Sequence, residues 1–129
     1  MWKAQRQVKE FHLKHSQYIS AVPTIPPDVV KDLRIELIFE EAHEFRVGAE
    51  MKDIIRVADA LGDLIYVILG AAVSYGIDME PIFETIHKSN MSKESGFKSR
   101  SGKALKTSSF APPELREILK KQGGGYNGR

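Results

Sequence analysis

Apolar residues recur at intervals of three and four along most of this chain, which is the spacing of an amphipathic helix. This pattern predicts four helices, over about 2–18, 28–47, 52–75 and 79–90, and a last short helix that opens at 111–114 and runs to about 121. No segment of useful length alternates between apolar and polar residues with a period of two. The expected fold class is therefore all-α, with four to five helices in one bundle.

Proline, glycine and aspartate mark the predicted helix ends. The prolines within 23–27 cannot continue a helix, so this segment is expected to be a rigid connector. Asp28 is a candidate N-cap of the second helix and Gly48 its stop, and Gly76 is well placed just past the end of the third. The short connection between the second and third helices predicts a central antiparallel hairpin.

Three of the predicted helices carry an apolar face that we expect to be buried. On the first helix, Val8, Phe11 and His15 share a face. On the hairpin, the apolar positions lie opposite the acidic ones, and they are Ile35, Ile38, Phe39, Ala42 and Phe45 on the first helix and Val57, Leu61, Leu64, Ile65, Ile68 and Ala72 on the second.

Five carboxylates lie on the polar side of this hairpin. On helices that turn about 100° per residue, Glu40 and Glu44 fall on one line with Glu41 beside them, and Asp59 and Asp63 share a line on the next helix. An antiparallel hairpin brings the two lines face to face. Crowded carboxylates repel one another, and hard divalent cations with oxygen ligands are the common remedy. The pattern predicts a metal site; the alternative is a solvated helix face paired with lysines.

Composition and charge narrow the class of protein. A length of 129 residues fits one domain, expected over 1–122, with a flexible glycine-rich tail over 123–129. The absence of cysteine excludes disulfides and thiolate metal sites and makes a reducing cytoplasm the default location. A formal charge of +2 is too small to indicate a nucleic-acid partner. No signal peptide is visible and no apolar run looks long enough to cross a bilayer, so no membrane partner is expected.

Basic and amide side chains follow the hairpin and could bind an anion. Asn90 and Lys93, at the end of the fourth helix, suit a phosphate chain, although both residue types are also common at ordinary helix ends. The basic segment 97–106, which contains Lys103 and Lys106, could fold over an anionic ligand or be a solvated connector.

Aromatic residues near the N-terminus could hold a base. Phe11 offers an aromatic face and His12 a hydrogen-bonding ring, and the alternative for Phe11 is a core position. Motifs of other nucleotide and hydrolytic enzymes are missing: the chain has no Gly-rich phosphate loop, no His-Glu-x-x-His zinc helix and no serine elbow.

Six short segments of the chain match known sequence motifs in the same order. They are 8–12 (Val-x-x-Phe-His), 40–44 (Glu-Glu-x-x-Glu), 58–67, 89–93 (Ser-Asn-Met-x-Lys), 102–106 and 112–115. Together they resemble the MazG-like all-α nucleoside triphosphate pyrophosphohydrolases, and most of all the phosphoribosyl-ATP pyrophosphohydrolase-like subgroup. The chain departs from the wider family at Ala60, where an acid is usual, and Asp59 is the candidate replacement.

This resemblance implies hydrolysis of a nucleoside triphosphate between its α and β phosphates, which yields a monophosphate and pyrophosphate. The implied metal is Mg²⁺, or Mn²⁺ in its place, on Glu40, Glu41, Glu44, Asp59 and Asp63. Glu41 or Glu40 would position or deprotonate the attacking water. The remaining roles fall to Asn90, Lys93, Lys103 and Lys106 for the pyrophosphate and to His12, Phe11 and Tyr66 for the base and sugar. Family members pair into dimers or dimers of dimers, so a homodimer or homotetramer is expected.

Three functions fit these residues. The first is an enzyme that removes unwanted or excess (deoxy)nucleoside triphosphates. The second is the phosphoribosyl-ATP step of histidine biosynthesis, which cleaves the same bond. The third is a non-catalytic helical module that binds nucleotide or a partner helix and uses its acids structurally.

Overall fold

The computed structural model describes residues 1–93, 98–106 and 110–123. Within these residues the chain forms helices and no strand, which confirms the all-α class. The helices are α1 (Lys3–Lys14), α2 (Asp28–Glu50), α3 (Ile54–Tyr75), α4 (Met79–Met91) and α5 (Arg116–Lys121). One isolated antiparallel bridge joins Lys98 to Ala104. The predicted flexible tail lies outside the described residues, apart from Gly123, and so does the first residue of the basic segment.

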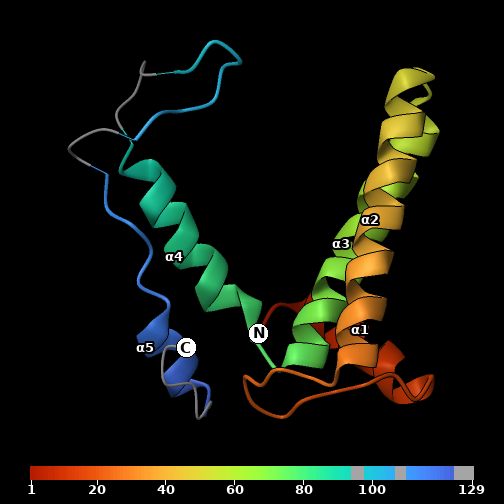
Figure 1. Ribbon diagram of the computed structural model, residues 1–129, viewed down its shortest axis with the longest axis vertical. Helices are drawn as coiled ribbons and strands as arrows, with labels where there is room; N and C mark the ends of the chain where they lie inside the picture. Colours follow the sequence, from red (N-terminus) through yellow and green to blue (C-terminus); the bar gives the residue numbers. More distant parts are fainter. Residues whose placement is uncertain (94–97, 107–109, 124–129) are drawn as a thin grey trace.

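The helices form two arms that diverge from a common base (Figure 1). In the first arm, α2 and α3 pack as the predicted antiparallel hairpin and α1 packs against α3. In the second arm, α4 leaves the base at an angle and α5 lies near its start, so α4 does not pack along the hairpin (Figure 1). The central hairpin is therefore covered by its own chain on one side only.

Both ends of α3 and the start of α4 lie where the sequence predicts them, and each has a capping residue. The Asp53 carboxylate accepts hydrogen bonds from the backbone N–H groups of Ile55 and Arg56 at the start of α3. Asp78 caps α4 in the same way through Glu80 N–H. Gly76 ends α3 in the left-handed conformation, at a φ of 70°.

The predicted end of α1, the predicted N-cap of α2 and the predicted end of α2 are wrong. α1 ends at Lys14, four residues early, because the chain turns at Ser16, whose φ is 53°. α2 begins at Asp28 itself, with Pro27 as the N-cap, and it runs through Gly48 to Glu50. Gly48 does not stop the helix; it lets the hairpin close, since a Cβ there would lie 3.1 Å from the Cβ of Arg56.

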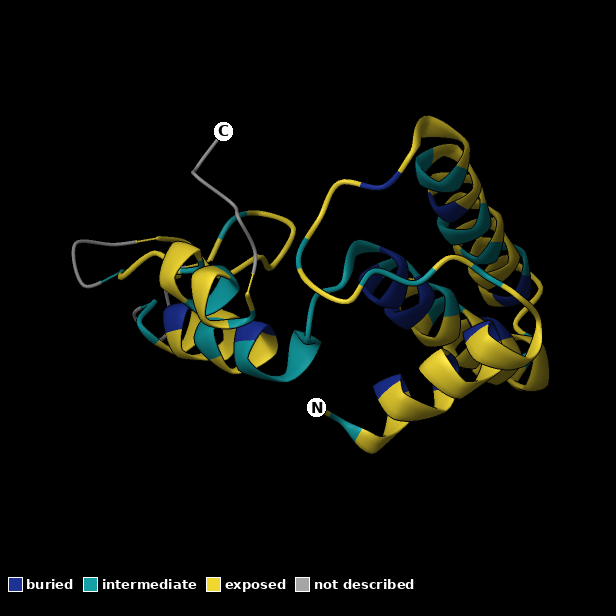
Figure 2. Cartoon of the chain, turned by 90° about the horizontal axis from the view of Figure 1, so that it is seen from below, coloured by how far each residue is buried: buried dark blue, intermediate teal, exposed yellow. Residues whose placement is uncertain are grey.

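The buried core lies at the base of the first arm (Figure 2). Its centre is formed by Val8, Leu69 and Val73. Trp2, Ile19 and Met79 pack around this centre. The predicted buried face of α1 is wrong beyond Val8, because the buried residues of α1 are Gln5, Val8 and His12. Polar side chains can occupy this face because each finds hydrogen-bond partners across the helix interface.

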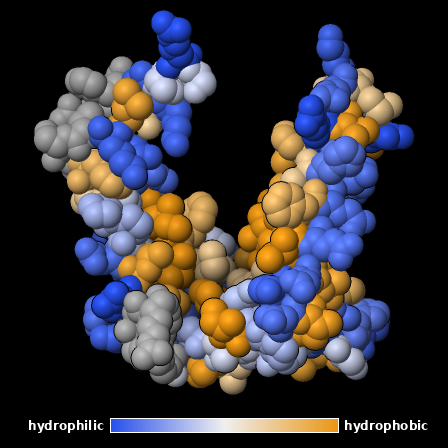
Figure 3. Space-filling view, viewed as in Figure 1, coloured by the Kyte–Doolittle hydropathy of each residue, from blue (hydrophilic) through white to orange (hydrophobic). Residues whose placement is uncertain are grey.

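Much of the apolar surface of the hairpin stays exposed, contrary to the sequence prediction. Phe39 on α2 is 72% exposed, and Ile65 on α3 is 58% exposed. On α4, Phe83 is 55% exposed. Apolar side chains gather on the sides of the two arms that face each other across the gap (Figure 3). Among the residues that the structure describes, no helix fills this gap.

α3 also corrects the expectation that no apolar run is long enough to cross a bilayer. By length and composition, Ile54–Tyr75 passes that test, as core helices of soluble proteins also do. Only 33% of the most apolar 18-residue stretch of α3 is buried inside this chain. α3 therefore keeps exposed apolar residues, such as Ile65, that its own chain does not bury.

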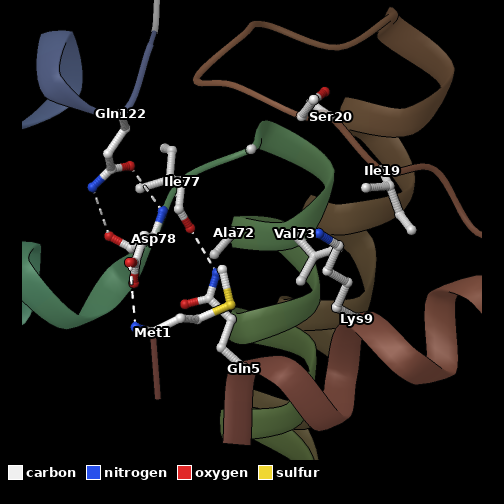
Figure 4. A pocket seen from close by; sticks show the side chains of 12 residues that line it. Met1, Gln5, Lys9, Ile19, Ser20, Ala72, Val73, Ile77, Asp78 and Gln122 are labelled. Atoms are coloured by element: carbon white, nitrogen blue, oxygen red, sulfur yellow. Dashed lines mark hydrogen bonds and ion pairs between the residues drawn. The ribbon is translucent and has the colours of Figure 1, made fainter. Parts of the chain in front are cut away.

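Two glutamines hold the turn between the arms (Figure 4). The Gln5 side chain donates to the Ile77 carbonyl oxygen at 2.6 Å and accepts from Met79 N–H at 3.0 Å. Gln122 accepts from Asp78 N–H at 2.9 Å and donates to the Asp78 carbonyl oxygen at 3.1 Å. These four bonds satisfy the backbone of the turn, and they tie α4 to α1 and α5.

Gly76→Ala should destabilise the fold, because its Cβ would lie 2.2 Å from the Val22 carbonyl oxygen in a backbone conformation that alanine disfavours. We expect a loss of more than about 1 kcal/mol in the free energy of unfolding. The measurement is urea denaturation followed by circular dichroism. Gly62→Ala is the control, since its Cβ meets open space within α3 and should stabilise by about 0.5–1 kcal/mol. Equal effects of the two substitutions would contradict this account.

Candidate functional site

Carboxylates from both helices of the hairpin meet in one open pocket of about 400 Å³. α2 contributes Glu41 and Glu44, and α3 contributes Asp59 and Asp63. They share this pocket because the antiparallel hairpin sets the two acidic lines opposite each other. Ala60, which is 3% exposed, lies in the helix interface at the same pocket. We refer to these four carboxylates as the acid pocket.

Glu41 is the member of the acid pocket that the others affect most. It is partly buried, whereas the other three are exposed. Burial raises the pKa of the Glu41 carboxyl, and the negative charges of Asp63, Glu40, Glu44 and Asp59 raise it further. Glu40 is exposed and does not line the pocket, although its charge acts on Glu41.

The acid pocket fits a hard cation in its chemistry but does not form a complete coordination shell. Its donors are carboxylate oxygens, which Mg²⁺ and Mn²⁺ prefer. Among the described residues, no three or more histidine, aspartate or glutamate side chains are close enough together to hold one ion by themselves. Mg²⁺ in nucleotide enzymes commonly uses one or two carboxylates together with substrate phosphates and water. This arrangement therefore suits a cation that arrives with a phosphate chain.

A second pocket, of about 420 Å³, adjoins the acid pocket along the hairpin. Its walls are mainly apolar, and its lining includes Phe11, Leu33, Leu37, Tyr66 and Val67. Phe11 and Tyr66 meet edge to face, with ring centroids 5.6 Å apart, and each is 41% exposed. We call this the aromatic pocket. Phe11 is therefore an accessible ring. The alternative interpretation, in which Phe11 is a core residue, is wrong.

His12, in contrast, is buried at 1% exposure beneath the aromatic pocket. Its Nδ1 lies 3.0 Å from the Tyr18 carbonyl oxygen, which can only accept, so Nδ1 carries the proton. Burial lowers the pKa of His12, and the charge of Arg34 lowers it further. The ring is therefore neutral, and Nε2 accepts from Arg34 Nη1 at 3.5 Å.

Arg34 is the residue of this pocket to which the sequence analysis gave no role. It is 5% exposed, and its Nη2 donates to the Gln17 side-chain oxygen at 2.8 Å. A Cβ at Gly70 would lie 3.0 Å from Arg34 Nη1 and 3.2 Å from His12 Nε2. The feature of the sequence that could have identified Arg34 is its position, seven residues before Glu41 and on the same face of α2.

The separation of the two pockets along the hairpin is similar to the separation of the base and the phosphates in a nucleotide. Arg34 and Glu41 are seven residues apart on α2, which is about 10 Å along the helix axis. On α3, Tyr66 follows Asp63 by less than one turn. A single elongated ligand can therefore contact both pockets.

The predicted phosphate-binding residues lie on the other arm. Asn90 is exposed near the end of α4. The amines of Lys93 and Lys106 lie 5.9 and 5.0 Å from the centroid of the Phe110 ring, and Lys103 is exposed in the bridge segment. Neither pocket of the hairpin includes any of these residues, and the arms are apart at this level (Figure 1).

Glu41→Gln should stabilise the metal-free protein at neutral pH, because it removes a charge that burial disfavours and that the neighbouring carboxylates repel. A carboxyl whose pKa is raised on folding favours the fold below its unfolded pKa of about 4.3 and loses that contribution as pH rises through the folded value. The gain in melting temperature should therefore be absent near pH 4 and present at pH 7, as thermal scans in chelator can measure. Glu36→Gln, at an exposed position on α2, is the control. A melting temperature of Glu41→Gln below that of the wild-type protein at pH 7 would contradict this prediction.

The comparison with known families agrees with this geometry. The family model described as phosphoribosyl-ATP pyrophosphohydrolase matches residues 8–90, a span that begins in α1 and ends in α4 and includes both pockets. No curated protein is similar enough in sequence to count as a match. Because the family model covers more than half of the 129 residues, the chain belongs to the phosphoribosyl-ATP pyrophosphohydrolase family, within the MazG-like all-α superfamily of nucleoside triphosphate pyrophosphohydrolases.

Proposed function

We propose that this pyrophosphohydrolase acts on (deoxy)nucleoside triphosphates, with Mg²⁺ or Mn²⁺, and cleaves between the α and β phosphates. The observation that carries the proposal is an acid pocket beside an aromatic pocket on one helix hairpin of this family. The phosphates would lie at the acids and the base at the aromatic rings. Removal of unwanted nucleotides from the cytoplasmic pool is the corresponding role.

Glu41 is the best candidate for the group that activates water. It lies in the pocket, and its raised pKa makes its carboxylate a stronger base than an exposed glutamate. Glu41 would take a proton from the attacking water as the new P–O bond forms and the bridging P–O bond breaks. The products would be a nucleoside monophosphate and pyrophosphate. Glu40, which lies outside the pocket, would act through its charge on Glu41.

The other carboxylates would hold the metal. Glu44, Asp59 and Asp63 line the pocket with Glu41 and supply hard oxygen donors. A bound Mg²⁺ would supply positive charge to the phosphates and to the developing leaving group. Asp59 and Asp63 lie one turn apart on α3, so both can reach the same side of a phosphate chain.

We also propose that the protein works as a homodimer or homotetramer. Apolar side chains gather on the sides of the arms that face the gap (Figure 3). The exposed apolar residues of the two arms include Ile65 on α3 and Phe83 on α4. Large exposed apolar patches mark interaction surfaces. A hairpin from a second copy would bring further apolar faces to cover this surface. In that assembly, Asn90, Lys93, Lys103 and Lys106 could meet the acid pocket of the other copy and hold pyrophosphate.

A membrane is a less suitable cover for the same surface. Asp63 lies near the middle of α3 with Asp59 one turn before it, and burying a carboxylate at the centre of a bilayer costs about 3 kcal/mol or more. The chain is therefore proposed to act in the cytoplasm, with no membrane or nucleic-acid partner.

Phosphoribosyl-ATP is a second candidate substrate, and the family match favours it. Hydrolysis of this compound breaks the same type of bond, so the acid pocket would perform the same chemistry. A non-catalytic nucleotide-binding module is the third possibility, and it predicts binding without turnover.

The substrate test is a panel of nucleoside triphosphates and phosphoribosyl-ATP incubated with the protein and Mg²⁺, followed by separation of products. Monophosphate with pyrophosphate is the expected result. Glu41→Gln should lower the rate about 10²- to 10⁴-fold while helical content stays the same. Asp63→Asn should cause a comparable loss, and Glu36→Gln should leave the rate unchanged. Turnover of phosphoribosyl-ATP alone would favour the second candidate, and phosphate as the first product would reject the proposal.

The assembly test is the molar mass in solution, measured by light scattering. A single chain has a mass of 14.5 kDa, and we expect at least twice that value. Ile65→Asp should shift the protein toward the single-chain mass, because it places a charge in the proposed interface. Ile25→Asp, at a position in the connector that is 78% exposed, should not. A wild-type mass of one chain at micromolar concentration would refute the dimer.

A further inference from the structure

Arg34 is a buried cation that has no anionic partner among the described residues. Its two hydrogen-bond acceptors, His12 Nε2 and the Gln17 side-chain oxygen, are neutral. None of the ion pairs in the described parts of the chain includes it. Its Nε is buried and has no hydrogen-bond partner there. A buried guanidinium in this state carries a desolvation cost that a ligand could offset.

The neighbours of Arg34 turn their acceptors toward it. The lone pair of His12 Nε2 faces Arg34, and the proton of His12 is committed to Tyr18. The Gln17 oxygen accepts from Arg34, and the Gln17 amide nitrogen donates to the His15 carbonyl oxygen at 3.4 Å. The guanidinium of Arg34 is therefore the charged group at the floor of the aromatic pocket. A ligand edge rich in acceptors would be attracted, and one with an amino group would meet donor against donor.

The walls of the pocket favour a planar ring over a phosphate at this floor. They are mainly apolar, and the two accessible rings of Phe11 and Tyr66 meet edge to face, which suits stacking. A phosphate would lose hydration against such walls without gaining further donors. The carboxylates that could take a metal-bound phosphate chain lie about 10 Å away along α2.

We infer that the aromatic pocket selects nucleobases with a keto oxygen at position 4 of a pyrimidine or position 6 of a purine, namely uracil, thymine, guanine and hypoxanthine, and that Arg34 is the residue that reads this oxygen. Guanidinium groups commonly bind O6 and N7 of guanine in a bidentate manner, and O4 of uracil or thymine can accept a single bond of the same kind. Adenine and cytosine place an amino group where these bases place the oxygen. Gly70 is a positioning residue, because a Cβ there would crowd both Arg34 Nη1 and His12 Nε2. This inference rests on the proposed hydrolysis of (deoxy)nucleoside triphosphates and adds the class of base, which is not the adenine of phosphoribosyl-ATP.

Two matched pairs of substrates test the inference with the wild-type protein. UTP and CTP differ at position 4 of the pyrimidine, and ITP and ATP differ at position 6 of the purine. With Mg²⁺, kcat/KM should favour UTP over CTP and ITP over ATP by about tenfold or more, because a hydrogen bond from the charged guanidinium is lost when an amino group replaces the keto oxygen. Ratios near one, or a preference for the amino bases, would overturn the inference even if every triphosphate is hydrolysed.

Two variants separate base reading from a structural role of Arg34. Arg34→Met should bring both ratios close to one by lowering kcat/KM for UTP and ITP more than for CTP and ATP. Tyr66→Leu, at an exposed ring, should lower all four values alike and keep the ratios. If Arg34→Met lowers all four substrates equally, Arg34 is structural and the inference fails. Should Arg34→Met not fold, Gly70→Ala makes the same prediction for the ratios.

Monophosphate binding keeps this inference distinct from the proposed hydrolysis. Calorimetry with UMP against CMP and IMP against AMP needs no turnover. Tighter binding of UMP and IMP would support the keto pocket even if no triphosphate is hydrolysed, in which case only the proposed function fails. Equal affinities within each pair would overturn the keto pocket and leave the hydrolysis proposal to its own test.

Discussion

Repulsion between carboxylates across the α2–α3 hairpin is the constraint that organises this molecule. The hairpin must be close enough for its helices to pack, as the contact of Gly48 with Arg56 shows, and that closeness sets Glu41 against Asp63. Burial at this hairpin raises the pKa of the Glu41 carboxyl, and the neighbouring negative charges raise it further. A fold that keeps such a cluster forgoes stability in the free state, which is common where a site must bind a cation.

The second constraint is apolar surface that one chain cannot bury. Gln5 and Gln122 hold the turn between α3 and α4, so α4 diverges from the hairpin and does not cover it. The exposed faces of α3 and α4 are consequently both apolar and both directed at the gap (Figure 3). A second copy would satisfy these faces and would also bring the basic residues of the second arm near carboxylates. In the proposed function, binding of the second copy would therefore also complete the active site.

The local structure could be predicted from the sequence because its causes are local. Asp53, Asp78 and Gly76 act within one turn of their own helix ends, and the acidic lines of α2 and α3 follow from helical spacing alone. Burial on α1 could not be predicted, because it depends on partners far along the chain. His12 is buried since Tyr18 and Arg34 satisfy its nitrogens, and Phe11 is left accessible beside Tyr66. The apolar backs of the hairpin were expected to be buried, but in the described part of the chain only α1 packs against the hairpin, and much of this surface stays exposed.

The central claim is that the acid pocket binds a divalent cation together with a phosphate chain. The most direct measurement is calorimetric titration of Mg²⁺ into the full chain, with and without a triphosphate analogue whose α–β bridge is an imido group. The account predicts binding that is markedly tighter with the analogue present and that Asp63→Asn weakens in both conditions. Mg²⁺ binding that is undetectable in both conditions, or that is unchanged by Asp63→Asn, would contradict it.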